Sequence, residues 1–493
     1  MAVKLNPIEI RNLGTYGLIR EASVDDNLIP DGAVVEAKNV HFDRIGAVTL
    51  RLGISNLHGT VSAGYPCLGV HNAFHSTLLV VFSDGTNNDI YCYHYQDPIY
   101  GTYWGKSLED DTKDAKTRFV DFAGRTIRVN GVDSSIRVWT GVDDGPSYWE
   151  YSGDPINPQQ LWNDDDPIKP KFIEVFKSRV YLAGDSKYPD RLFFSTVIDS
   201  SGNISWLLDT NYVDINPKDG ENITALKRYS LELLIFKPNY IYRFRTSGVD
   251  PDPLIKIGTR SQESVIEGKK GLYFHHDTGF YRYSGGYPVE ISKPILDFVE
   301  NISYSNYEDI CAWKDNDHIY WSVGDVTING ETWKNVVLRY TESTEVWTVY
   351  SYAYRPTWAG EYDDGYEIRR IFGADNGVVY KLDDGYTDDG EPIGYYFITK
   401  WYELGSILDR KVIQEIVALM EKSQASKVMY QIDDESKWKD LGQTQEFLTY
   451  FKNLNQKCYR IRFKLAGISR VEPFIFKGFI ISECLNEGKI EKL

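Results

Sequence analysis

Residues 310–350 carry the clearest structural signal in the chain: ICAWKDNDHIYWSVGDVTINGETWKNVVLRYTESTEVWTVY. Four runs of apolar, β-branched and aromatic residues stand in this stretch, at Ile310–Trp313, Ile319–Val323, Val336–Tyr340 and Val346–Tyr350. Asp, Asn, Gly and Thr separate the runs, and such residues allow the chain to reverse. Short apolar runs between turn formers are typical of strands. The stretch therefore predicts a four-stranded antiparallel meander.

The same pattern occurs six more times along the chain. The units begin near Leu78, Phe119, Phe172, Ile223, Gly271 and Arg370. Their starts lie about 40 to 60 residues apart, which is the period of propeller blades that bury their faces against one another. We therefore predict an all-β fold whose main part is a β-propeller of six to eight irregular blades. Stacked β-sandwiches, which would produce the same strands without the radial repeat, are the alternative.

Two other regions flank the propeller, which we assign to residues 65–394. Residues 1–64 hold few strong strands beyond a hairpin at Val40–Asp43 and Ala47–Arg51, and we interpret them as an N-terminal arm with the first strands. Residues 395–493 return to apolar runs, and Tyr459–Leu465 alternates basic with apolar residues. Because a strand with one solvated face shows this alternation, we expect a C-terminal β-sandwich-like domain.

Composition excludes several classes of protein. The 493 residues include 54 Lys and Arg against 71 Asp and Glu, a formal charge of −17. Proteins that grip nucleic acid phosphates or an anionic membrane need an excess of cations, so neither class fits. Aromatic residues are abundant, with 36 Tyr, 22 Phe and 12 Trp against 3 Met. Rings favour pleated, half-buried surfaces, and we expect them to pack between the blades.

Cysteines and the ends of the chain indicate the cellular setting. Five cysteines are scattered without a C-x-x-C pair, at Cys67, Cys92, Cys311, Cys458 and Cys484. This spacing predicts neither a disulfide framework nor a zinc site, and we expect buried thiols in a protein made in a reducing cytoplasm. The N-terminal MAVKLNPIEI lacks the apolar segment of a secretion signal, and no apolar run approaches the length of a spanning helix. We expect neither an export signal nor a membrane anchor.

Motifs for catalysis and metal binding do not converge. Gly101–Ser107 is similar to a phosphate-binding loop, but three residues separate its glycines where that loop has four. His275 and His276 are neighbours on an expected strand, so their rings point to opposite faces and do not share one ion. A structural or exposed role is more common for such a pair. We therefore predict no catalytic, cofactor-binding or metal-binding residues.

Aspartate clusters are the remaining candidates for a bound ion. They lie at Asn163–Pro167, Asp143–Gly145, Asp363–Gly365 and Asp383–Gly385. Carboxylate oxygens bind Ca²⁺, but none of these clusters follows the spacing of a calcium-binding loop. Asp-Gly pairs also form ordinary hairpin turns. We predict no cofactor, and calcium stays an alternative.

Propeller enzymes are the alternative from another functional class. Sialidases and other glycosidases would place a carboxylate pair, or a Tyr with a carboxylate, at the propeller axis. Ser83–Thr86 is similar to the Asp-box turn of sialidases but lacks the flanking Trp that defines it. A glycan-hydrolysing or glycan-binding propeller therefore remains open. A receptor-binding adhesin, whose exposed rings would stack on sugars, is a third option.

Three sets of short motifs along the chain together form a recognisable pattern. The first reads as a proline-glycine turn, an A-x-N-V-x-F strand and an R-x-G close, at Ile29–Ala33, Ala37–Asp43 and Arg51–Gly53. The second contains Arg191–Ser195, Trp206, Ile223–Leu226 and Leu233–Lys237, and the third contains Arg460–Gly467, Pro473, Phe474 and Phe479–Ile481. This pattern resembles the tail-nozzle or tail-hub proteins of short-tailed bacteriophages, which are tail tubular protein B-like and stabilise packaged DNA.

The resemblance implies a structural virion protein without enzymatic activity. It would form a ring, of six copies, at the distal end of the tail below the adaptor or head-to-tail connector ring. It would extend the DNA ejection channel, help to retain the packaged genome and contact tail fibre or needle proteins. The chain would be assembled in the host cytoplasm and located in the tail of the virion.

The acidic charge suits a conduit for DNA. Duplex DNA carries one negative charge per about 1.7 Å of its axis, and a basic wall would bind it tightly by releasing counterions. An acidic wall lets DNA slide without sequence-specific binding. We therefore predict that Asp and Glu side chains line the lumen of the ring.

Overall fold

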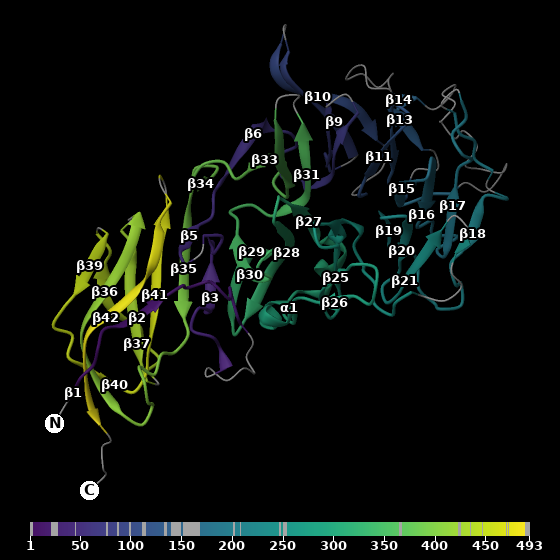
Figure 1. The fold of residues 1–493 in the computed structure, drawn as a ribbon. Helices are drawn as coiled ribbons and strands as arrows, with labels where there is room; N and C mark the ends of the chain where they lie inside the picture. Colours follow the sequence, from purple (N-terminus) through teal and green to yellow (C-terminus); the bar gives the residue numbers. More distant parts are fainter. Residues whose placement is uncertain are drawn as a thin grey trace.

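Figure 1 shows the ribbon of the chain, a computed structural model. The structure describes residues 3–20, 28–44, 46–74, 77–85, 88–97, 100–110, 115–132, 136–139, 149–150, 168–200, 203–207, 209–245, 248–249, 254–363, 367–422, 425–433, 435–445, 447–469, 471 and 473–488. Strands dominate these residues. Beside them stand a four-residue helix and short 3-10 turns, α1 (Leu296–Val299), η3 (Gln262–Ser264), η4 (Lys293–Ile295) and η5 (Tyr304–Asp309). The prediction of an all-β fold is confirmed. Within the described ranges, no helix is long and apolar enough to cross a membrane.

Six separate four-stranded antiparallel sheets form blades of the propeller. The first three contain β7 (Cys67–Ala73), β8 (Thr77–Ser83), β9 (Asn88–Asp97) and β10 (Gly101–Asp110); β11 (Arg118–Phe122), β12 (Arg125–Val129), β13 (Arg137–Trp139) and β14 (Trp149–Glu150); β15 (Phe172–Phe176), β16 (Arg179–Ala183), β17 (Arg191–Phe194) and β18 (Tyr212–Asp214). The next three contain β19 (Ala225–Tyr229), β20 (Glu232–Phe236), β21 (Ile241–Arg245) and β22 (Gly248–Val249); β23 (Ile266–Glu267), β24 (Leu272–His276), β25 (Gly279–Tyr283) and β26 (Val289–Glu290); β27 (Cys311–Lys314), β28 (His318–Ile328), β29 (Glu331–Thr341) and β30 (Val346–Ser351).

A further group of four strands closes the ring. It consists of β31 (Pro356–Asp363), β32 (Ile368–Ala374), β33 (Val378–Leu382) and β6 (Ile54–Thr60). β6 precedes all the other blades in sequence and pairs antiparallel with β33. β31 contacts β27 on one side and β7, the first strand of the first blade, on the other. Hydrogen bonds between the two ends of the propeller segment therefore hold the circle shut, and the predicted propeller is confirmed.

Aromatic side chains pack between neighbouring blades, as expected. The ring of Phe280 on β25 lies 4.7 Å from that of Trp321 on β28 and 5.7 Å from that of Trp347 on β30 in the next blade, measured between centroids. Both Trp321 and Trp347 are buried. Rings at such distances gain more than their buried area alone provides. The aromatic excess therefore stabilises the contacts between blades.

A β-sandwich forms the second body of the molecule, at the left of Figure 1. One of its sheets contains β36 (Arg410–Lys422), β42 (Ile475–Gly488), β39 (Leu448–Phe451), β40 (Gln456–Cys458), β1 (Val3–Lys4), β2 (Ile8–Arg11), β4 (Val40–His41) and β5 (Val48–Leu50). The other contains β35 (Glu391–Thr399), β41 (Ile461–Ser469), β37 (Lys427–Ile432), β38 (Lys439–Gln443) and β3 (Val34–Lys38), and continues through β34 (Thr387–Asp388) to β6. Facing rings such as Phe463 and Phe479, with centroids 4.4 Å apart, fill the space between the sheets.

Strands from residues 1–64 do not form an arm of their own. β1, β2 and β5 pair with β42, β4 pairs with β5, and β3 pairs with β35. The sandwich therefore combines both parts of the chain that flank the propeller, while β6 belongs to the closing blade. Sequence periodicity shows that a segment is extended, but it does not say which distant strand will pair with it.

A single apolar core joins the two bodies. Its buried members include Trp321 and Phe298 beside the propeller blade β27–β30, Val34 on β3, and Phe397 and Phe476 in the sandwich. Because protein interiors pack as densely as organic crystals, such a continuous core holds propeller and sandwich in one fixed relation.

Candidate functional site: the junction of propeller and sandwich

The propeller axis, where a glycosidase would have its carboxylates, is narrow and lined by paired polar groups. A cavity of about 170 Å³ lies there, and its lining includes His71, Arg118, Glu174 and Glu263. Arg118 donates to both carboxylate oxygens of Glu263, at 2.6 and 3.1 Å, and to the carbonyl of Lys171. The innermost strands thus fill the axis with side chains that bind one another.

Electrostatics at the axis do not favour a general acid. Burial alone would raise the pKa of Glu263, but the cations of Arg118 and Lys116 lower this pKa below its usual range. A glycosidase acid needs the opposite shift. Among the described residues, no group of three or more His, Cys, Asp or Glu side chains is placed to hold a metal ion.

The weak sequence candidates have ordinary structural positions. Gly101–Ser107 lies within strand β10, so it is not a phosphate-binding loop between a strand and a helix. His275 and His276 are both buried on β24, which excludes an exposed role. Burial lowers the pKa of His275 to about 3 and also lowers the pKa of His276, so both rings are neutral at physiological pH.

The aspartate clusters are only partly within the described residues. Asp383 pairs with Arg370 at 2.7 Å, and Asp384 pairs with Lys381 at 3.1 Å. Both carboxylates therefore have side-chain cations as partners. The predictions at Asn163–Pro167 and Asp143–Gly145, and most of Asp363–Gly365 and the end of Ser83–Thr86, lie outside the described residues.

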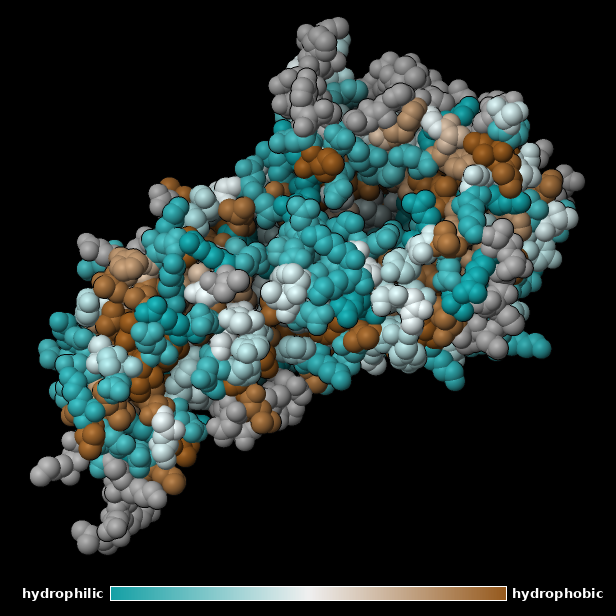
Figure 2. Space-filling model, in the orientation of Figure 1, coloured by the Kyte–Doolittle hydropathy of each residue, from teal (hydrophilic) through white to brown (hydrophobic). Residues whose placement is uncertain are grey.

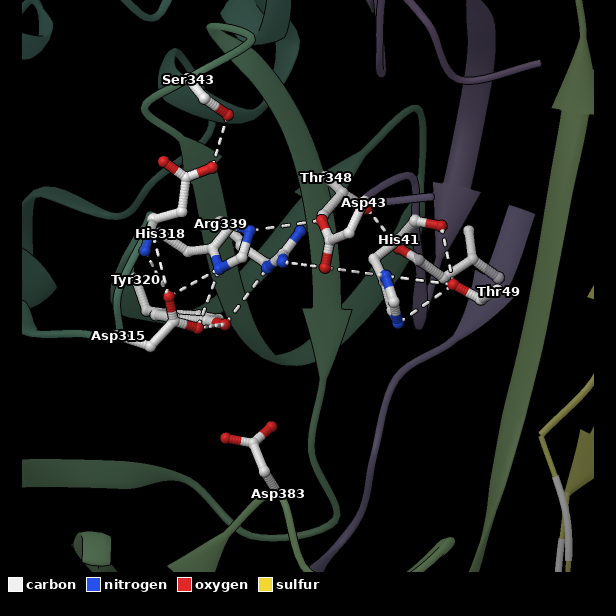
Figure 3. Close-up of polar contacts among 12 residues, drawn as sticks. His41, Asp43, Thr49, Asp315, His318, Tyr320, Arg339, Ser343, Thr348 and Asp383 are labelled. Carbon is white, nitrogen blue, oxygen red and sulfur yellow. Dashed lines mark hydrogen bonds and ion pairs between the residues drawn. The ribbon is translucent and has the colours of Figure 1, made fainter. Parts of the chain in front are cut away.

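The most elaborate polar cluster lies where the N-terminal segment meets the blade β27–β30 (Figure 3). Asp43, between β4 and β5, accepts from Arg339 of β29 at 2.6 Å and lies 3.3 Å from the Nε2 atom of His318 on β28. The other ring nitrogen of His318 lies 2.7 Å from Asp315. Asp315 also accepts from the hydroxyl of Tyr320, which in turn accepts from Arg339. The cluster links sandwich and propeller through alternating charges.

Its charges are held in place at neutral pH. Burial would raise the pKa of Asp43, but hydrogen bonds from His318 and His41 and the charge of Arg339 lower this pKa far below its usual range. Burial would lower the pKa of His318, but bonds to Asp315 and Asp43 raise it. Arg339 is only 3% exposed. A buried cation of this kind is stable only with its partners in place.

A second polar cluster, at Asn39, Arg51 and Asp388, joins the same two bodies. Arg51 is 1% exposed and donates to the two carboxylate oxygens of Asp388 at 2.8 and 2.6 Å. Its Nε donates to the side-chain oxygen of Asn39 at 2.9 Å, and its Nη2 donates to the carbonyl of Ser351 at 3.0 Å. Asn39 adopts the left-handed conformation, with φ of 58°, and also donates to the carbonyl of Gly394. One guanidinium thus ties β5, β30 and β34 together.

Gly53 completes this cluster because no other residue fits. A Cβ atom at this position would lie 1.9 Å from the carbonyl oxygen of Thr387, beside Asp388. The chain therefore passes β34 at a distance that only glycine allows.

These residues lie in the first of the stretches that resemble tail-nozzle proteins. Asn39 lies in the A-x-N-V-x-F strand, and Arg51 and Gly53 make the R-x-G close. In the folded chain, Asn39, Arg51 and Gly53 therefore lie at the joint between propeller and sandwich. Sequence reasoning identified the pattern but missed this role, because Asp388 lies 337 positions from Arg51.

Comparisons with known proteins give no family. No family model matches the chain, and no curated protein matches it. Two solved structures of the extracellular domain of a two-component or one-component system of B. thetaiotaomicron are similar at 11% identity, with TM-scores of 0.44 and 0.43. The first alignment covers 70% of this chain and 44% of that one; the second covers 89% and 61%. The chain thus spans less than two thirds of either structure, and the likeness carries no argument about function.

Proposed function

We propose that the chain is a structural protein of the tail nozzle of a short-tailed bacteriophage, in a ring that extends the DNA ejection channel below the adaptor. The observation that carries this proposal is the junction. The residues that resemble the nozzle family, Asn39, Arg51 and Gly53, are those that join propeller and sandwich. These three residues make buried contacts between distant segments, so the resemblance includes residues on which the fold depends and is not limited to residue types common in strands.

The architecture suits a subunit in the wall of a ring-shaped channel. A continuous apolar core and two buried polar clusters make one elongated body from two β-folds (Figure 1). A ring around a pressurised channel needs subunits that transmit load without bending between domains. The acidic composition suits a lumen through which DNA slides. The proposal includes the expectation that Asp and Glu side chains line this lumen.

The glycan-hydrolysing alternative has less support. It requires an axial carboxylate with a raised pKa, whereas the pKa of Glu263 at the axis is lowered and its oxygens are bound by Arg118.

Immunogold electron microscopy of the parent phage particle tests the proposal. Antibodies against this chain should label the distal end of the tail, and mass spectrometry of purified virions should detect the polypeptide in a small fixed number of copies. Absence of the polypeptide from purified virions, or release of sugars from glycans by the purified chain, would overturn it.

A further inference from the structure

The outer face of the sheet β35–β41–β37–β38 carries a row of alternating cations and aromatic rings. Arg462 and Lys464 lie on the face of β41 opposite the buried Phe463 and Leu465. We call the row the cation–aromatic ladder, and it consists of Arg460, Trp401, Arg462, Trp438, Lys464 and Tyr396.

Neighbouring members of the ladder lie within cation–π distance of one another. Arg460 and Arg462 lie 4.7 and 4.5 Å from the centre of the Trp401 ring. Arg462 and Lys464 lie 5.3 and 5.8 Å from Trp438, and Lys464 lies 4.4 Å from Tyr396. Each contact is of the cation–π kind, which holds long side chains in one orientation. The ladder is therefore a pre-arranged row of positive charge.

One end of the ladder is already covered by the propeller. Trp333 of β29 is 1% exposed, and its ring lies 6.0 Å from Tyr396 and 5.5 Å from the ammonium group of Lys38. Beyond Tyr396 the same chemistry continues, but Trp401, Trp438, Arg462 and Lys464 stay partly exposed. Among the residues the structure describes, Lys464 forms no ion pair. The junction thus extends into a similar surface that stays partly exposed among the described residues.

Charge is divided unequally along the chain. Residues 395–493 contain 16 Lys and Arg against 13 Asp and Glu, whereas residues 65–394 contain 32 against 51. The formal charges are therefore +3 and −19. Two acidic propellers brought together would repel each other, whereas the cations of the ladder would attract an acidic propeller.

We propose that the partly exposed ladder binds the acidic propeller surface of a second copy of this chain. Arg, Trp and Tyr are the residue types that dominate the energy of protein interfaces, and Met429 lies opposite Lys464 on the neighbouring strand. Figure 2 shows apolar residues among hydrophilic ones on the sandwich, at the left. A contact between unlike surfaces repeats from copy to copy and closes into a ring when the rotation allows.

A nucleic acid strand fits the ladder less well. Single strands bind aromatic residues by stacking bases on free ring faces. Here Trp401 already has two guanidinium groups against its ring, and Trp438 has a guanidinium and an ammonium group. The rings therefore serve to orient cations rather than to receive bases.

The inference rests on the proposed ring of identical copies, and carbodiimide cross-linking of the full chain tests it. Unlabelled and ¹⁵N-labelled protein are mixed at low salt and joined by carbodiimide, which couples amines to carboxylates in direct contact. We expect mixed-isotope cross-links between Lys464 and carboxylates of residues 65–394. Sedimentation velocity should show self-association that weakens as salt rises.

A double variant and a matched control make the test specific. Arg462→Glu with Lys464→Glu should weaken self-association at least tenfold. Lys452→Glu changes a cation that also lies over a ring, 5.2 Å from Tyr450, but beside the other sheet, and should leave association unchanged. The neutral pair Arg462→Gln with Lys464→Gln, with an unchanged melting temperature, separates loss of binding from loss of folding.

Several results would overturn the inference. These are a wild-type chain that stays monomeric at low salt, a double variant that associates like wild type, or ladder-dependent binding of a fluorescent single-stranded oligonucleotide in place of self-association. Virion labelling separates this inference from the proposed function. Labelled tails without Lys464 cross-links would contradict only the ladder, and cross-links without labelled tails would contradict only the nozzle.

Discussion

Replacing Arg51 with methionine tests the junction at its most buried point. The variant leaves the carboxylate of Asp388, whose side chain is 5% exposed, with the backbone amide of Ala353 as a donor in the described part of this cluster. It also removes the donors that Arg51 supplies to Asn39 and to the carbonyl of Ser351. Removing one partner of a buried ion pair costs about 3–5 kcal/mol in unfolding free energy.

That cost converts to a measurable shift in melting temperature. At about 2.1 cal/mol/K per residue, unfolding the 493-residue chain as one unit has an entropy of about 1 kcal/mol/K. The expected loss is therefore about 3–5 °C, measured by circular dichroism at pH 7, and more if the junction unfolds before the propeller. Limited proteolysis should cut between propeller and sandwich sooner in the variant than in wild type.

The double variant Arg51→Met with Asp388→Leu is the control. It removes the stranded carboxylate, so it should melt above the single variant despite carrying one more change. A melting temperature of Arg51→Met within about 1 °C of wild type, or a double variant with additive losses, would show that this ion pair does not hold the two bodies together.

Three further predictions concern the junction and the buried thiols. Because folding raises the pKa of His318, the stability that this residue contributes is complete below a pH of about 6.5 and is lost as the pH rises through the raised pKa. The difference in melting temperature between wild type and His318→Gln should therefore shrink from pH 6 to pH 9. A difference that grows with pH would contradict the assignment. Gly53→Ala should lower the free energy of unfolding by about 1–3 kcal/mol, because the added Cβ meets the Thr387 carbonyl. Gly286→Ala is the control, since the space around its Cβ is open, and it should melt like wild type. Equal melting temperatures of the two variants would refute the close approach at Gly53. Burial raises the pKa of the Cys67, Cys311 and Cys458 thiols to about 12, so a thiol reagent at pH 8 should detect them only after unfolding in guanidinium, and rapid reaction in native protein would contradict their burial.

Sequence periodicity predicted the blades well because their signal is local. The runs at Ile319–Val323 and Val336–Tyr340 lie within β28 and β29 and are buried throughout, and short apolar runs between turn formers are typical of such strands. β31 was harder to foresee, since Pro356, Gly360 and Glu361 interrupt its pattern, and its burial comes from the neighbouring strands β27 and β7. All five cysteines are buried and unpaired, as predicted.

Partnership between distant segments was outside the reach of pattern reasoning. Residues 1–64 read as an arm because their strands are short, yet they pair with strands hundreds of positions away. The cation–aromatic ladder was visible only as a basic strand at Tyr459–Leu465. Its rings come from other segments, and only pairing in the sheet brings Trp401, Trp438 and Tyr396 beside those cations.

The sequence by itself determined the all-β class, the radial repeat and the acidic charge. These properties follow from local periodicity and composition, which each segment carries whatever its neighbours are. Only the tertiary structure decided that β6 closes the propeller, that both ends of the chain build one sandwich, and that Arg51 meets Asp388. A buried charge is stable only when its partner reaches it, and the folded topology alone brings those two side chains together.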